Sequence, residues 1–95
     1  MNEEIGNFIR SKLLGSLLKT YEHCQVHIRY IDDYNILQIT LCRKITECTT
    51  WTYNRIYVNP LEEMAKDSNY VDDVYFDFMM HVNHWIMNKF ERRDS

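Results

Sequence analysis

The chain has 95 residues, of which 45% are hydrophobic and 26% are charged, and its formal net charge at pH 7 is −3. This length and composition predict one globular domain spanning residues 1–95 and exclude a disordered polypeptide. The negative charge argues against a nucleic-acid-binding protein, because phosphate neutralisation gives such proteins a basic face. No segment approaches the roughly eighteen apolar residues of a membrane helix, so no membrane association is expected.

The N-terminal segment is predicted to form a helix that faces the core. Apolar side chains recur there at steps of three and four residues, at Ile5, Phe8, Ile9, Leu13, Leu17 and Tyr21. Gly6 and Gly15 interrupt the pattern, each at a cost of about 1 kcal/mol relative to alanine. We interpret them as points of close approach to a neighbouring element. The segment starts acidic and has no apolar run of the signal-peptide type.

From Cys24 onward the apolar spacing changes to two, which is typical of half-buried strands. The alternating apolar residues are Cys24, Val26, Ile28 and Tyr30 in one run and Leu37, Ile39 and Leu41 in the next. Turn residues at 32–35 separate these runs, and a tight connection near residues 43–46 leads to a third strand within residues 47–59. Such short links predict a three-stranded antiparallel meander. The odd number of cysteines (Cys24, Cys42 and Cys48), without a secretory signal, predicts reduced thiols in a cytoplasmic protein.

Two helices are predicted to close the fold. The segment "NPLEE" predicts a capping box, with Asn59 at the cap, Pro60 at the first helical position and Glu62 at the third, and hence a short helix over residues 60–67. A long helix is expected over residues 70–92, because acidic residues occupy its first turn and basic residues its last. The element order is α-β-β-β-α-α, an α+β fold with the helices packed on one sheet face.

The third strand supports two interpretations. If Trp51, Tyr53 and Tyr57 faced solvent beside Arg55, they would form a stacking surface for RNA or DNA. The polar residues Thr50, Thr52 and Asn54 on the opposite face favour aromatic side chains that point into the core instead. Ile56 and Val58 then fall on the polar face, and a bulge near Asn54 would bring both apolar sets onto one side.

Catalytic and metal-binding motifs are absent from the sequence. It contains no glycine-rich phosphate loop, nucleophile elbow or zinc-protease helix, so no enzyme and no cofactor are expected. Asp77, His81 and His84 could share one flank of the last helix, but a zinc site needs three or four convergent ligands, and we predict no metal site. On the strand, Cys24 and His27 point to opposite faces because their separation is odd.

The last helix carries an apolar line in addition to its core-facing stripe. At about 100° per residue, Val71, Val74, Tyr75, Phe78, Val82, Trp85 and Ile86 face the core, whereas Phe76, Met80 and Met87 fall roughly opposite. Apolar side chains in that position predict contact with a protein partner, for which methionine is an adaptable residue. A homodimer through this helix is one outcome, and a different protein is the other.

Six carboxylates lie between residues 62 and 77, opposed only by Lys66: Glu62, Glu63, Asp67, Asp72, Asp73 and Asp77. Helix starts favour acids, which accounts for part of this run. The rest predicts partial mimicry of nucleic-acid phosphates, with Phe76, Met80 and Met87 completing the partner-binding surface.

The order of elements with clustered acids loosely resembles that of small phage-encoded anti-CRISPR proteins, although no sequence motif is shared. The resemblance implies a non-enzymatic, phage-encoded inhibitor that acts as a DNA mimic on a host nucleic-acid-processing or defence enzyme. The alternatives are a small RNA- or DNA-binding module that uses Trp51, Tyr53, Arg55 and Tyr57, and a homo-oligomeric accessory or structural protein.

Overall fold

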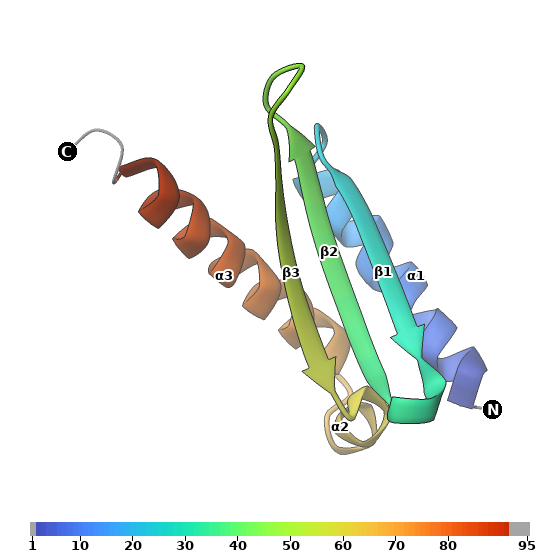
Figure 1. Cartoon of the computed structure of the whole chain (residues 1–95). Helices are drawn as coiled ribbons and strands as arrows, with labels where there is room; N and C mark the ends of the chain where they lie inside the picture. Colours follow the sequence, from blue (N-terminus) through green and yellow to red (C-terminus); the bar gives the residue numbers. More distant parts are fainter. Residues whose placement is uncertain (1, 92–95) are drawn as a thin grey trace.

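The computed structural model describes the backbone of residues 2–91, and the side chains of residue 4 and residues 6–86 (Figure 1). Its elements are α1 (Asn2–Thr20), β1 (Gln25–Ile31), a 3-10 turn η1 (Asp32–Tyr34), β2 (Ile36–Lys44), β3 (Thr50–Val58), α2 (Pro60–Lys66) and α3 (Tyr70–Glu91). The predicted α+β class and the order α-β-β-β-α-α are confirmed. The side chains of Ile5 and Met87, and the end of the last helix at Arg92, lie outside the described part of the chain.

The strands form an antiparallel meander in the order β1-β2-β3. Leu41 pairs with Val26 on one side and Tyr53 on the other, and Leu37 pairs with Tyr30 and Tyr57. The β2–β3 register runs without interruption from Ile36↔Val58 to Lys44↔Thr50, so the bulge expected near Asn54 is wrong. The connection predicted near residues 43–46 instead occupies residues 45–49, because both strands continue to the Lys44↔Thr50 pair.

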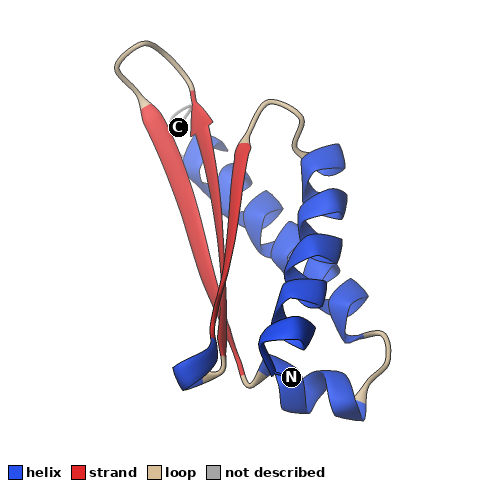
Figure 2. Cartoon of the chain, turned by 90° about the vertical axis from the view of Figure 1, so that its right-hand side faces the viewer, coloured by secondary structure: helices blue, strands red, loops and turns tan. Residues whose placement is uncertain are grey.

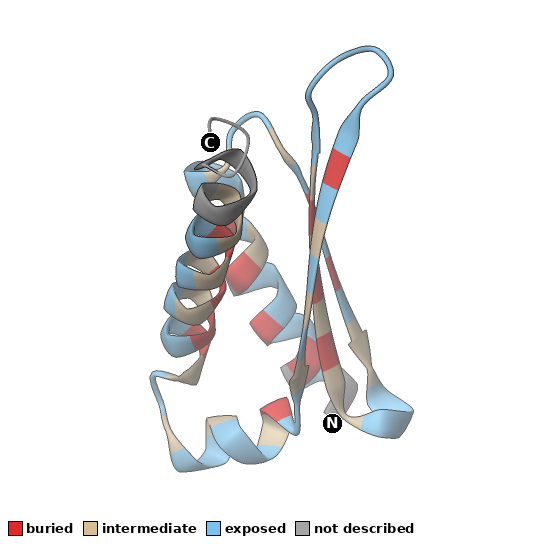
Figure 3. Cartoon of the chain, turned by 60° about the vertical axis from the view of Figure 1, so that its left-hand side comes forward, coloured by how far each residue is buried: buried red, intermediate tan, exposed pale blue. Residues whose placement is uncertain are grey.

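Both long helices cover the same face of the sheet, as Figures 2 and 3 show from two sides. The core lies between the two layers, and eight of its members have no exposed surface or nearly none: Ile9, Leu13, Leu17, Leu37, Ile39, Leu41, Phe78 and Val82. Each comes from a position that the periodicity assigns to a core face. The opposite face of the sheet is open to solvent, and Gln38, Thr40 and Asn54 form hydrogen bonds across its strands.

The capping box predicted at Asn59 is wrong, although the helix begins where expected. Asn59 adopts a left-handed conformation with φ 54°, and its side chain makes no capping hydrogen bond. The carboxylate of Glu62 accepts a hydrogen bond from the side-chain amide of Asn35 instead of reaching back to the Asn59 N–H. That N–H is already bonded to the Asn35 carbonyl at 2.9 Å, which ties the start of α2 to the turn between β1 and β2.

Candidate protein-binding surface

Three carboxylates gather where α2 meets α3. Asp72 and Asp73 are exposed in the first turn of α3, and Asp67 ends α2 close to them. A hydrogen bond with Asp67 raises the pKa of Asp73 above its usual value, and the charges of Asp67 and Asp72 add to the effect. Among the described residues, none of these three carboxylates forms an ion pair. The negative charge of this corner therefore has no ion-pair partner in the described part of the chain.

Two large apolar side chains are exposed next to these carboxylates. Phe76 is 54% exposed and Met80 is 68% exposed. On α3 they lie with Asp72 and Asp73 within an arc of about 100°, so the four side chains share one face of the helix. Phe76 also borders a shallow depression between α1 and α3, which is lined by Ser16, Lys19, Thr20, Asp72, Tyr75 and Phe76. We call Asp67, Asp72, Asp73, Phe76 and Met80 the acidic–apolar surface.

The other acids predicted for partner binding make contacts of their own. Glu62 contacts Asn35 beside the β1–β2 turn, and Glu63 lies near the Tyr70 phenol, where its charge adds to burial in raising the pKa of Tyr70 to about 12. The remaining residue of the predicted set, Met87, has no described side chain. The acidic–apolar surface therefore contains five of the nine predicted residues.

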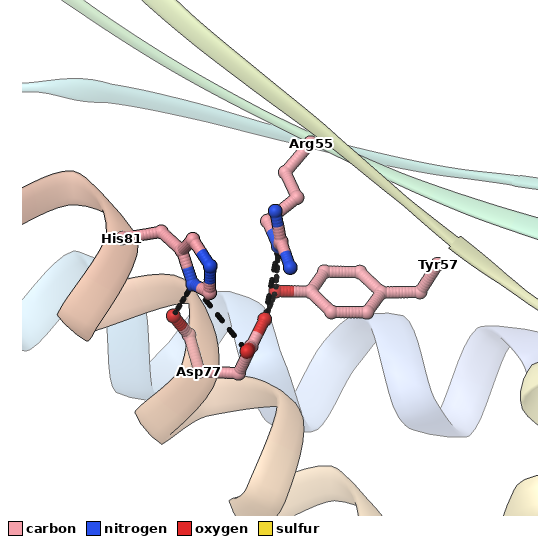
Figure 4. Close-up of polar contacts among 4 residues, drawn as sticks. All are labelled: Arg55, Tyr57, Asp77 and His81. Atoms are coloured by element: carbon pink, nitrogen blue, oxygen red, sulfur yellow. Dashed lines mark hydrogen bonds and ion pairs between the residues drawn. The ribbon is translucent and has the colours of Figure 1, made fainter. Parts of the chain in front are cut away.

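Asp77 belongs to a partly exposed polar cluster between α3 and β3 (Figure 4). Its Oδ2 accepts hydrogen bonds from Arg55 Nε at 2.9 Å and from the Tyr57 hydroxyl at 2.5 Å. His81 Nδ1 donates to the Asp77 carbonyl at 2.7 Å and lies 3.4 Å from Oδ1. Burial opposes ionisation of Asp77, but the hydrogen bonds from Tyr57 and Arg55 outweigh it and hold its pKa below the usual value.

The aromatic residues of β3 face the helices and not the solvent. Trp51 is only 6% exposed and meets Trp85 edge-on, with ring centroids 5.0 Å apart. Tyr53 stacks on Trp85 at 5.3 Å and also contacts Phe78 at 5.7 Å. Together with Arg55 and Tyr57, which bond to Asp77, these residues join the two layers. They do not form the solvent-facing stacking surface that a nucleic-acid-binding module would need.

The polar cluster was not predicted from the sequence, and without the bulge Ile56 and Val58 stay on the open face of the sheet. Arg55 occupies a helix-facing position of β3, and a charge in such a position needs a partner from the covering helix, which was the available signal for Asp77. On the open face, Ile56 is 55% exposed and Val58 is 64% exposed, beside Ile31 and Ile36 at the same end of the sheet.

Within the described part of the chain, no three potential metal ligands come together, and no helix has the length and apolar character needed to cross a membrane.

Comparison with protein-family models, curated proteins and solved structures finds no match to the chain.

Proposed function

We propose that this protein is a non-enzymatic binding protein that uses the acidic–apolar surface to occupy a basic groove on a nucleic-acid-processing or defence enzyme and inhibits that enzyme. The observation that carries the proposal is the placement of exposed Phe76 and Met80 beside carboxylates that have no ion-pair partner in the described structure. An exposed apolar patch surrounded by charge is the usual form of a protein-binding site.

Charge complementarity determines the class of partner. A groove that binds phosphates is lined with Lys and Arg, and carboxylates at its entrance replace the phosphate charges. Phe76 and Met80 supply the apolar contact that phosphates cannot make, which gives affinity beyond simple attraction of charges. Binding to such a groove excludes nucleic acid from it, and exclusion is sufficient for inhibition without any catalytic group.

A different protein fits this surface better than a second copy of the chain. A twofold dimer brings the same patch of each copy together. Here that would gather the carboxylates of both copies in one interface without a cation among the residues of the patch, and like charges brought together are unfavourable. We therefore propose a heterologous partner and not the homodimer through α3.

The proposal is tested by capture of proteins from the extract of a candidate host cell on the immobilised protein. Wild type is compared with Asp72→Lys/Asp73→Lys and with Phe76→Ser/Met80→Ser. A matched control, Ile56→Ser/Val58→Ser, removes two equally exposed apolar side chains from the open sheet face. We expect both α3 variants to lose the captured protein, the control to retain it, and added duplex DNA to displace it.

The dependence on salt gives a second measurement. Because the carboxylates are solvent-exposed, their attraction to a basic groove is screened as ionic strength rises, so capture should weaken steeply. Capture that is unaffected by salt and by the charge reversals would reject a charge-complementary partner. Equal capture by wild type and Phe76→Ser/Met80→Ser would reject the acidic–apolar surface as the binding site.

A further inference from the structure

The two edges of the sheet differ in how they are protected. On β1, the side chain of Arg10 reaches from α1 and its Nε donates a hydrogen bond to the Ile28 carbonyl at 2.8 Å. On β3, the hydrogen bonds among described residues include none to the outer backbone edge. An unprotected edge presents a row of unpaired N–H and C=O groups, which is a template for another strand.

The register identifies the backbone groups on the free edge. In an antiparallel pair, residues alternate between pairs that exchange hydrogen bonds and pairs whose N–H and C=O point outward. The Ile28 carbonyl accepts a bond from Arg10 and therefore points away from β2. Ile28 and Ile39 are thus a pair that exchanges no hydrogen bonds, so the backbone groups of Ile39 point toward β3. On β3, the residue opposite Ile39 is Arg55. Arg55 therefore points its backbone groups toward β2. Counting in steps of two, the free edge carries the backbone groups of Thr52, Asn54 and Ile56.

The helix layer is wider than the sheet that covers it. Two helices side by side span about 20 Å, whereas three strands spaced about 4.8 Å apart cover about 14 Å, a difference of about one strand. Figure 1 shows where the difference lies, because the C-terminal half of α3 extends past the β3 edge. On that part of α3, Met80, His81 and His84 line a shallow depression.

We propose that the free edge of β3 accepts an extended segment of another protein as a fourth strand, which would lie over the C-terminal half of α3. The strand's alternate side chains would point down onto the Met80–His81–His84 depression, so apolar residues are expected at every second position. This site is separate from the acidic–apolar surface, apart from the side chain of Met80, and does not depend on the function proposed above.

A second copy of the chain does not fit this edge. Full-length pairing of β3 with β3 of another copy would put a twofold axis beside the middle of the strand. In Figure 1, α3 crosses beneath β3 and leaves the sheet near that point, so the two copies of α3 would occupy the same space. A single strand without its own helix layer avoids this clash.

The test uses a synthetic peptide that copies β2, Ile36–Lys44, with serine in place of Cys42. This sequence already pairs with β3 on its other side and has apolar residues at every second position. Binding is measured by fluorescence anisotropy, and the site is located by amide shifts in NMR spectra. We expect shifts in Thr52, Asn54 and Ile56 and in α3 near His81. A control peptide with N-methyl groups on the hydrogen-bonding amides should lose at least tenfold in affinity.

The variant Thr52→Pro removes one free-edge N–H without breaking the bonds to β2, since proline is tolerated on that side of an edge strand. It should weaken binding of the unmodified peptide at least tenfold, while its thermal unfolding shows that the fold is retained. Asp72→Lys should leave binding unchanged, which separates this site from the acidic–apolar surface. Equal binding of both peptides, shifts confined to the acidic corner, or no binding of the unmodified peptide would overturn the proposal.

Discussion

The two glycines of α1 should respond differently to the same substitution, and only one of the two variants should gain stability. At Gly15, which is exposed, an added Cβ would meet no atom within 4 Å. Gly15→Ala should therefore gain the full helix propensity, about 1 kcal/mol in the free energy of unfolding. At Gly6 a Cβ would lie 2.7 Å from Cγ of Tyr30, inside the contact distance of two carbon atoms. The Tyr30 ring would have to move, although its hydroxyl is bonded to Asn35.

Forcing an extra methyl group against a packed ring costs about 1–3 kcal/mol, which equals or exceeds the propensity gain. Gly6→Ala should therefore leave stability unchanged or lower it by up to about 2 kcal/mol. Thermal unfolding resolves the contrast, because 1 kcal/mol shifts the Tm of a domain of this size by about 4–8 °C. If Gly6→Ala raised the Tm as much as Gly15→Ala, the close packing of Tyr30 on α1 would be refuted.

Four further substitutions test the core, the exposed face of α3 and the polar cluster. Tyr21→Phe should raise the free energy of unfolding by about 1 kcal/mol in urea titration, because the buried Tyr21 hydroxyl has no partner among the described residues; a loss of stability would show that the hydroxyl is bonded. Phe78→Ala should cost about 3–5 kcal/mol and Phe76→Ala less than about 0.5 kcal/mol, since the first ring is fully buried and the second is 54% exposed. Asp77 has a lowered pKa in the folded state, so its contribution is present above about pH 4 and is lost as pH falls through the folded pKa. The stability difference between wild type and Asp77→Asn should therefore shrink in acid, and a difference that is constant with pH would contradict this assignment.

Apolar periodicity was sufficient to predict the layers of the fold. The inward positions of β2, Leu37, Ile39 and Leu41, are all fully buried, as their spacing of two requires. The exposure of Phe76 and Met80 likewise followed from their angle on α3. These predictions depend only on which face of one element a residue occupies, and that is a local property of the sequence.

Contacts between layers could not be predicted in this way. The bond between Arg55 and Asp77 depends on where α3 crosses β3, and the bond between Glu62 and Asn35 depends on how α2 leaves the sheet. The spacing of apolar residues determines neither the position at which α3 crosses β3 nor the direction in which α2 leaves the sheet. As a result, Asp77 was grouped with its neighbours in sequence, Asp72 and Asp73, although its carboxylate is bonded to Arg55 and Tyr57.

The meander has a consequence for the order of folding. The strands are adjacent in sequence and in space, so the sheet requires only short loop closures, which are fast. By contrast, α3 contacts β3 through pairs far apart in the chain, such as Trp51 with Trp85. We expect the sheet and α1 to assemble in the transition state and α3 to dock afterwards. In stopped-flow kinetics, Ile39→Val should then slow folding, and Phe78→Ala should mainly accelerate unfolding. Late docking would leave the inner face of β3 transiently uncovered, so that a competing strand could reach it before α3 does.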